Sequence, residues 1–115
     1  MDEKIKNMIE NNIVSFATSS KDGKPNVIAV ACLKIVDDKI IITDNYMNKT
    51  KKNLEENNKV ALVVWKNEEG YQLKGTAEYI IEGKWFDFVK NLKENKDLPA
   101  KAVVVVTIEE VCKLA

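Results

Sequence analysis

The stretch from Asn26 to Val36 constrains the fold of this chain more than any other. Its sequence, NVIAVACLKIV, is apolar on both faces for most of its length, which is typical of a strand that is covered from two sides. Tight turns flank it, with Asp22-Gly23 before it and Asp37-Asp38 after it. Because Asp-Gly is a strong hairpin signal, the neighbouring strands are expected to pair with this stretch in antiparallel fashion.

Strand and helix patterns alternate along the rest of the chain. Segments rich in β-branched and aromatic residues predict further strands at residues 13–19, 39–43, 59–65, 71–81 and 102–108. Helical spacing of apolar residues predicts an amphipathic helix over residues 2–12. Two more helices are predicted, one over residues 49–57 and one after Glu82-Gly83 with a shared face formed by Trp85, Phe88, Val89 and Leu92.

About six strands and a few short helices in 115 residues predict one domain, residues 1–115, of mainly β (α+β) class. The tight turns make the sheet antiparallel in large part. Closure of so short a sheet into a small barrel removes its exposed edges, so we expect a barrel. A ferredoxin-like sandwich is the structural alternative.

The chain contains neither histidine nor arginine, and this excludes several kinds of chemistry. Without histidine there is no Ser–His or Cys–His nucleophile, and the commonest metal ligand is missing. Without arginine, any bound anion must be held by lysine, hydroxyl and backbone N–H groups. Lysines and acidic residues number 18 each, so the formal net charge of zero argues against nucleic acid as a partner.

Cys32 and Cys112 form no CxxC motif and predict neither a metal site nor a disulfide scaffold. Cys32 lies in an apolar run, so we expect a buried, unreactive thiol there. The N-terminal segment MDEKIKNMIENN is acidic and amphipathic, unlike a signal peptide. No apolar run approaches the roughly 20 residues that span a bilayer. We therefore expect a soluble, cytoplasmic protein with no membrane partner.

The helix predicted to begin near Lys49 carries its charges in an unusual order. Lys49, Lys51 and Lys52 crowd its first turn, whereas two glutamates lie toward its end. The helix dipole favours the opposite arrangement, but a bound anion would reverse that preference. Free N–H groups at the helix start, a lysine and the Thr50 hydroxyl suit a phosphate monoester. A solvated, lysine-rich turn is the simpler alternative.

Two other polar spots are candidates for ligand contacts. Thr43, Asp44 and Asn45 lie at the end of the strand predicted over residues 39–43 and can hydrogen-bond the edge of a heterocycle, although a loop entry or helix cap would need the same residues. Gln72, in a later strand, can donate to a cofactor oxygen, and Gly75 allows another backbone to approach closely. Ordinary turn and strand roles are the alternatives for both.

Taken in order, these features resemble the pyridoxamine 5′-phosphate oxidase-like superfamily of FMN-binding split barrels, and within it the minimal single-domain FMN-binding proteins. The order is an Asp-Gly hairpin, a Pro-led strand, a strand ending in Thr, a Lys-Thr helix start and a Gln-containing strand. The resemblance covers nearly the whole chain, in the stretches IVSFATSSKDGKPNVIAVACLK, IIITDNYMNKTKKNLEENNKVALVV, YQLKGTAEYI and KAVVVVTIEEV. It implies a six-stranded antiparallel split β-barrel.

The resemblance also implies which residues contact FMN. The residues implied at the isoalloxazine ring are Asn26, Val27 and Ile28, and those implied at its polar edge are Thr43, Asp44 and Asn45. The residues implied at the phosphate are Lys49 and Thr50, with Asn53 reaching the phosphate or the ribityl chain. Gln72 is implied as a further cofactor contact, either from the same subunit or from its neighbour.

The expected function is that of a homodimeric flavoprotein with one FMN per subunit near the interface. It would be a small oxidoreductase or electron-transfer protein that exchanges electrons with a nicotinamide nucleotide, another small molecule or a redox protein. No catalytic side chain and no metal are expected, because the flavin supplies the redox chemistry. A non-catalytic flavin carrier or sensor, and the same fold with a deazaflavin or haem, are the alternatives. Pyridoxamine phosphate oxidases proper use Arg and His at their substrate, so vitamin B6 oxidation is not expected here.

Overall fold

The computed structural model describes residues 1–31 and 33–114, and the prediction made for Cys32 lies outside them. The strands in this part of the chain are β1 (Val14–Ser19), β2 (Pro25–Val30), β3 (Leu33–Val36), β4 (Lys39–Asp44), β5 (Lys59–Lys66), β6 (Glu69–Ile80) and β7 (Ala102–Leu114). The helices are α1 (Glu3–Asn11), α2 (Lys49–Glu56), α3 (Lys84–Lys90) and the 3₁₀ turn η1 (Lys93–Asn95). No helix among these residues is long and apolar enough to cross a membrane.

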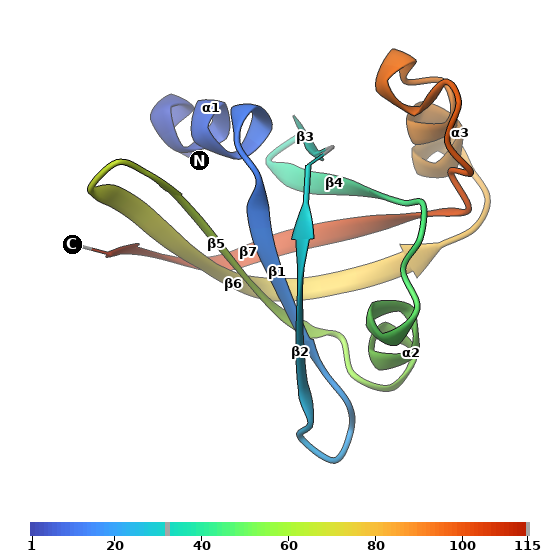
Figure 1. Ribbon diagram of the computed structural model, residues 1–115, viewed down its shortest axis with the longest axis horizontal. Coiled ribbons are helices and arrows are strands. Elements are labelled where there is room, and N and C mark those ends of the chain that lie inside the picture. Colours follow the sequence, from blue (N-terminus) through green and yellow to red (C-terminus); the bar gives the residue numbers. More distant parts are fainter. Residues whose placement is uncertain (32, 115) are drawn as a thin grey trace.

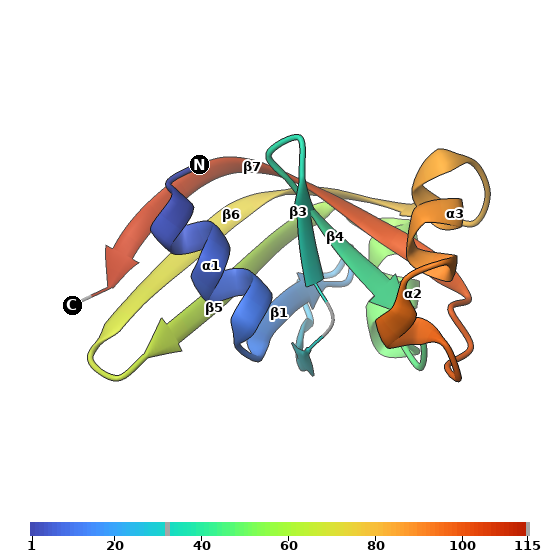
Figure 2. The same cartoon turned by 90° about the horizontal axis from the view of Figure 1, so that it is seen from above.

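The strands form one antiparallel sheet in the order β2-β1-β5-β6-β7-β4-β3 (Figure 1). The sheet curls strongly, and its two edge strands, β2 and β3, are consecutive in the sequence. Figure 2 shows α1 lying along the open side of the curl, beside β3. The structure therefore confirms the predicted split barrel of antiparallel strands and excludes the ferredoxin-like alternative.

The strand predicted over residues 26–36 is divided in two, which is why the sheet has seven strands where six were predicted. Its first part, β2, pairs with β1, and its second part, β3, pairs with β4. These partners lie toward opposite edges of the sheet, so no straight strand can pair with both. Periodicity could not reveal the division because both parts are apolar.

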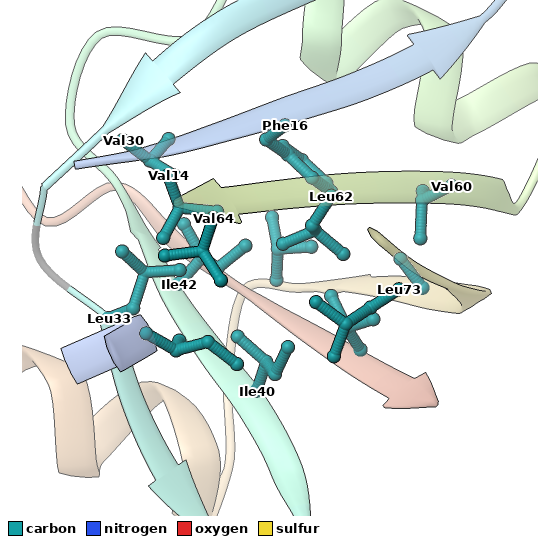
Figure 3. Close-up of a cluster of buried hydrophobic side chains, with 14 of the residues drawn as sticks. Val14, Phe16, Val30, Leu33, Ile40, Ile42, Val60, Leu62, Val64 and Leu73 are labelled. Carbon is teal, nitrogen blue, oxygen red and sulfur yellow. The ribbon is translucent and has the colours of Figure 1, made fainter. Parts of the chain in front are cut away.

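An apolar core fills the inside of the curled sheet (Figure 3). Phe16, Leu62 and Leu73 from β1, β5 and β6 meet Leu33 and Ile42 from β3 and β4, and each is at most 1% exposed. The helix α1 adds its buried face of Ile5, Met8 and Ile9, and Asp2 caps the helix by accepting a hydrogen bond from the Lys4 N–H at 2.7 Å.

The helix α3 covers part of the outer face of the sheet, over β4 and β7 (Figure 1). Val89, fully buried, packs with Ile41, Val103 and Val105, which explains why the first half of β7 is buried on both faces. Phe88, predicted on the packed face of this helix, is 36% exposed, and Phe86 packs there instead. At 3.6 residues per turn, Phe86 lies about 60° from the buried Val89 around the helix and Phe88 about 100° from it on the other side, so the buried face includes Phe86 and leaves Phe88 exposed.

The ladder between β6 and β7 shifts register between Lys74 and Gly75. At this irregularity the two backbones approach so closely that a Cβ atom built on Gly75 would lie 2.0 Å from the carbonyl oxygen of Thr107. Such a distance is far inside van der Waals contact, and the obstacle is backbone, which cannot rotate away. The bend in this strand pair therefore requires glycine at position 75.

We expect Gly75→Ala to lower the free energy of unfolding by at least about 2 kcal/mol, because overpacking against a backbone forces the two strands apart. Urea denaturation monitored by circular dichroism measures this loss. The control is Lys74→Ala, an exposed neighbour, which should change stability by no more than about 0.5 kcal/mol. Equal stability of the two variants would contradict the close approach.

Candidate functional site

A pocket of about 560 Å³ lies between the two edges of the split barrel. Small-molecule sites in proteins occupy roughly 300–1,000 Å³, so the pocket is large enough for a cofactor. Its lining comes from β2 and the residue that follows it, the end of β4, the loop after β4, the start of α2, and one residue before β7: Asn26, Ile28, Ala29, Val30, Ala31, Ile42, Thr43, Asn45, Tyr46, Met47, Asn48, Lys49, Thr50 and Leu98.

The division of the long strand creates this pocket. Among the described residues, β4 pairs with β3 as far as Ile42, opposite Leu33, and beyond it Thr43 and Asp44 pair with β7. β2 likewise has β1 as its one neighbour in the described sheet. Two strand edges therefore face the pocket, and edge strands carry backbone N–H and C=O groups that a ligand can engage.

The pocket is apolar along its sheet side and polar at its helix end. Ile28, Val30 and Ile42 supply the apolar wall. Ala29 and Ala31, on either side of Val30, add only small side chains to it. A flat, apolar ring system fits such a surface. Polar and charged side chains gather where the loop after β4 runs into α2.

The first turn of α2 forms the helix end of the pocket. Within the described chain, the N-cap residue Asn48 makes no side-chain capping bond, and the first turn holds no acidic residue. The first N–H groups of a helix have no acceptor within the helix, so they are available to an anion. Thr50 is 1% exposed and accepts a hydrogen bond from Nδ2 of Asn26 at 3.2 Å, which links β2 to this corner.

The structure brings six of the ten residues implied by the family resemblance into the lining of this one pocket, although they come from β2, β4, the following loop and α2. These six are Asn26, Ile28, Thr43, Asn45, Lys49 and Thr50. The other four, Val27, Asp44, Asn53 and Gln72, lie outside the lining, each for its own structural reason.

Val27 is 65% exposed, because successive side chains on a strand point to opposite faces and its neighbours Asn26 and Ile28 point inward. Asn53 is buried on the inner side of α2, where its Nδ2 donates to Oγ1 of Thr18 at 3.1 Å. This bond fastens the helix to β1. Asn53 is therefore placed to hold α2 in position rather than to face the pocket.

Gln72 lies on the outer face of the sheet, in the middle of β6. A row of paired residues runs across four strands from Ala29 through Ser15 and Val63 to Gln72. Three strand spacings amount to about 14 Å, which is too far for contact with the pocket of the same subunit. A contact from Gln72 with a ligand would have to be made to the pocket of a neighbouring subunit.

Asp44 is completely buried and supports the pocket from behind. Its Oδ1 accepts the Met47 N–H at 2.8 Å, and its Oδ2 accepts the Tyr79 hydroxyl. The ammonium of Lys101 lies 3.8 Å from Oδ1 and compensates the carboxylate charge. Burial, together with the bond to Asp44, raises the pKa of the Tyr79 hydroxyl, so that Tyr79 remains a donor. Asp44 thus holds the loop that forms one side of the pocket.

Sequence reasoning missed Asn95, a buried polar residue in η1 that is 2% exposed. Its Nδ2 donates to Oγ1 of Thr43 at 2.9 Å and to the carbonyl oxygen of Val89 at 2.8 Å. Its Oδ1 accepts from Nδ2 of Asn45 at 3.4 Å. The surrounding sequence, KENKD, is as polar as a solvated loop, so it contains no signal that one of its residues is buried.

The sequence profile of the family described as pyridoxamine 5′-phosphate oxidase matches residues 1–114. The chain belongs to this family. The uncharacterized protein MJ0282 of Methanocaldococcus jannaschii is similar to it, with 42% identity over an alignment of 118 positions that covers 97% of this chain and 79% of that protein. The family resemblance inferred from the order of motifs is therefore confirmed.

Solved structures with the same fold carry different functional descriptions. HupZ of Group A Streptococcus matches with a TM-score of 0.92 and 26% identity, over 99% of this chain and 94% of that one. An FMN-binding protein from Syntrophomonas wolfei subsp. wolfei matches with a TM-score of 0.82 and 21% identity, over 98% and 85%. An F420 reductase matches with a TM-score of 0.72 and 18% identity, over 93% and 94%. At these identities the last two show the shared fold.

We expect Asp44→Ala to lower the free energy of unfolding by about 2–4 kcal/mol, since it leaves the Met47 N–H and the Tyr79 hydroxyl buried without their acceptor. Urea denaturation measures the change. In the control, Glu3→Ala removes an exposed carboxylate that pairs weakly with Lys6, and stability should change by less than about 1 kcal/mol. An equally small effect at Asp44 would show that its bonds do not hold the loop.

Proposed function

We propose that this protein is a cytoplasmic, homodimeric flavoprotein that binds FMN in the pocket between β2, β4 and α2 and acts as a small oxidoreductase or electron-transfer protein. The observation that carries the proposal is the order in which apolar and anion-binding surfaces follow one another along one pocket. An apolar wall for a flat ring leads to a helix start that offers free N–H groups, a lysine and a hydroxyl. FMN has the matching order of ring, chain and phosphate monoester.

Different residues of the lining would contact different parts of the cofactor. Ile28 and its neighbours on β2 would lie against the isoalloxazine ring, and Thr43 and Asn45 would meet its polar edge. Lys49 and Thr50 would hold the phosphate together with the first N–H groups of α2. Membership of the family and the fold shared with an FMN-binding protein support this assignment.

Bound flavin would supply the redox chemistry, and the chain would bind it, orient it and shield it from water. The chain has no histidine for acid–base catalysis and no arginine to grip a second phosphate. These absences make vitamin B6 oxidation a poor candidate within the family. They leave electron exchange with a nicotinamide nucleotide, another small molecule or a redox protein, which requires no catalytic side chain.

The uncovered outer face of the sheet supports the proposed homodimer. Small and apolar side chains occupy this face across β2, β1 and β5, among them Ala29, Ala17 and Val63, and no described helix packs over them. Val27 and Trp65 on the same face are 65% and 57% exposed. An apolar surface of this kind marks an interface.

The face also adjoins the pocket, because Ala29 belongs to both. A second subunit seated on this face would therefore approach the cofactor, and Gln72 on the same face would be within its reach. This arrangement would place one FMN per subunit near the interface.

A deazaflavin is the second candidate cofactor, favoured by the fold shared with an F420 reductase. It carries a phosphate on a similar side chain, so the helix end of the pocket would suit it equally. Titration of the purified protein with FMN and with a deazaflavin separates the two.

Haem fits less well, because histidine, its common axial ligand, is absent. Anaerobic mixing of the flavin complex with NADH or NADPH then separates a reductase from a carrier. In a reductase the visible absorption of the flavin bleaches, and in a carrier it does not.

We expect the double change Lys49→Ala with Thr50→Ala to weaken FMN binding by about 2–4 kcal/mol, because it removes a charge-assisted and a neutral hydrogen bond to the phosphate. Riboflavin, which has the ring but no phosphate, should bind both proteins equally. Fluorescence quenching of the flavin measures both affinities. Lys66→Ala, at an exposed lysine on β5 outside the pocket, serves as the control. Full FMN affinity in the double variant would overturn the phosphate assignment.

We expect Val63→Glu, in the middle of the uncovered sheet face, to convert the dimer to a monomer, since it would bury a carboxylate in the interface without a partner. Sedimentation equilibrium measures the mass. Ile81→Glu is the matched control, because Ile81 is 66% exposed but lies beyond β6, away from this face. Loss of the dimer in both variants, or in neither, would contradict the proposed interface.

A further inference from the structure

Asn95 joins two of the pocket residues to the backbone through a buried chain of hydrogen bonds. Its amide nitrogen donates to Thr43 and to the carbonyl oxygen of Val89, and its amide oxygen accepts from Asn45. The amide oxygen of Asn45 in turn accepts the Ala100 N–H at 2.8 Å. The network therefore begins at one backbone group and ends at another.

These two backbone groups determine the direction of every bond between them. A carbonyl oxygen can only accept, so the Asn95 atom beside Val89 must be its NH₂ group. A backbone N–H can only donate, so the Asn45 atom beside Ala100 must be its amide oxygen. Both amide orientations follow from chemistry, and neither side chain can flip without placing like groups against each other.

Thr43 and Asn45 each keep one hydrogen-bond donor that this network does not use. The Asn95 amide nitrogen cannot accept a hydrogen bond, because its lone pair is delocalised into the carbonyl group. The Thr43 oxygen therefore accepts that bond, and its hydroxyl hydrogen points elsewhere. Asn45 gives one amide hydrogen to Asn95 and keeps the second. The carboxylate of Asp44, which lies between them in the sequence, accepts hydrogen bonds from Met47 and Tyr79 and pairs with Lys101 behind the pocket. This end of the pocket therefore presents hydrogen-bond donors from side chains.

We propose that Asn95 is a positioning residue that determines ligand specificity by holding Thr43 and Asn45 as donors toward the pocket. The ligand edge that fits them is one of adjacent acceptors, such as the carbonyl-bearing ring of a flavin. This inference rests on the proposed function and adds to it the polarity of the site. Because reduction places further electron density on that ring, fixed donors favour the reduced flavin over the oxidised one.

The matched pair Thr43→Val and Thr18→Val tests this role. Both threonines are buried, at 7% and 4% exposure, and each accepts a bond from a buried asparagine, but only Thr43 lines the pocket. We expect Thr43→Val to lower the affinity for FMN and for riboflavin by the same factor, about 3- to 10-fold. Thr18→Val releases Asn53 on α2, at the phosphate end of the pocket, so it should leave the affinity for riboflavin, which has no phosphate, within about twofold of wild type. Thr43→Ser, which restores the hydroxyl, should recover the affinities for FMN and riboflavin.

Asn95→Leu tests the action at a distance, since Asn95 does not line the pocket. It should reduce both affinities by a similar factor. Combining it with Thr43→Val should add little further loss, because Asn95→Leu already releases the hydroxyl that Thr43→Val removes. The midpoint potential of the bound flavin should fall in each variant, because the reduced form should lose more affinity than the oxidised form. Each tenfold difference between these two losses lowers the potential by about 30 mV. The infrared carbonyl bands of bound flavin should move to higher wavenumber.

Two results would overturn the inference. In one, Thr43→Val and Thr18→Val change affinity and potential equally, which would mean a general loss of stability. In the other, Asn95→Leu folds and binds flavin with unchanged affinity, potential and carbonyl bands. Failure of the wild-type protein to bind any flavin would instead reject the proposed function, and the proposed ligand polarity with it.

Discussion

The structure depends on the fact that the two edge strands of a curled sheet are neighbours in the sequence. Because β2 and β3 pair at opposite ends of the strand order, the chain must bridge the opening of the barrel between them. The edges of β2 and β4 lie on either side of one space, and in the described part of the chain they retain backbone groups that the sheet does not pair. The pocket therefore results from incomplete closure of the barrel, and it needs no insertion or extra domain.

The elements around the opening hold its geometry in place without entering it. Asp44 fastens the loop after β4, Asn53 fastens α2 to β1, and Asn95 fastens η1 to the end of β4. Each is a buried polar residue, and no buried side-chain nitrogen or oxygen atom in the described part of the chain lacks a hydrogen-bond partner. Buried polar groups cost free energy unless they are paired, so each network has one favourable arrangement. These hydrogen bonds hold the elements that line the pocket in one arrangement.

Much of the candidate site could be predicted from the sequence where the chemistry is local. The crowding of lysines at Lys49 is visible in a few consecutive residues, and an uncapped helix start lies there in the structure. Asn26 and Thr43 needed the family resemblance, since each alone is compatible with ordinary turn or strand roles. Asn95 could not be found, because its partners are Thr43 and Asn45, about fifty residues earlier in the chain.

By itself, the sequence determined the antiparallel strands, the positions of the helices, the family and the charge pattern at the start of α2. These follow from turn chemistry, periodicity and motifs that act over a few residues. The tertiary structure alone decided that one apolar stretch becomes two edge strands, that Val27 and Gln72 face outward, and that Asp44 turns behind the pocket. Such outcomes depend on which distant strands pair and on which polar groups find partners, and no local pattern encodes those contacts.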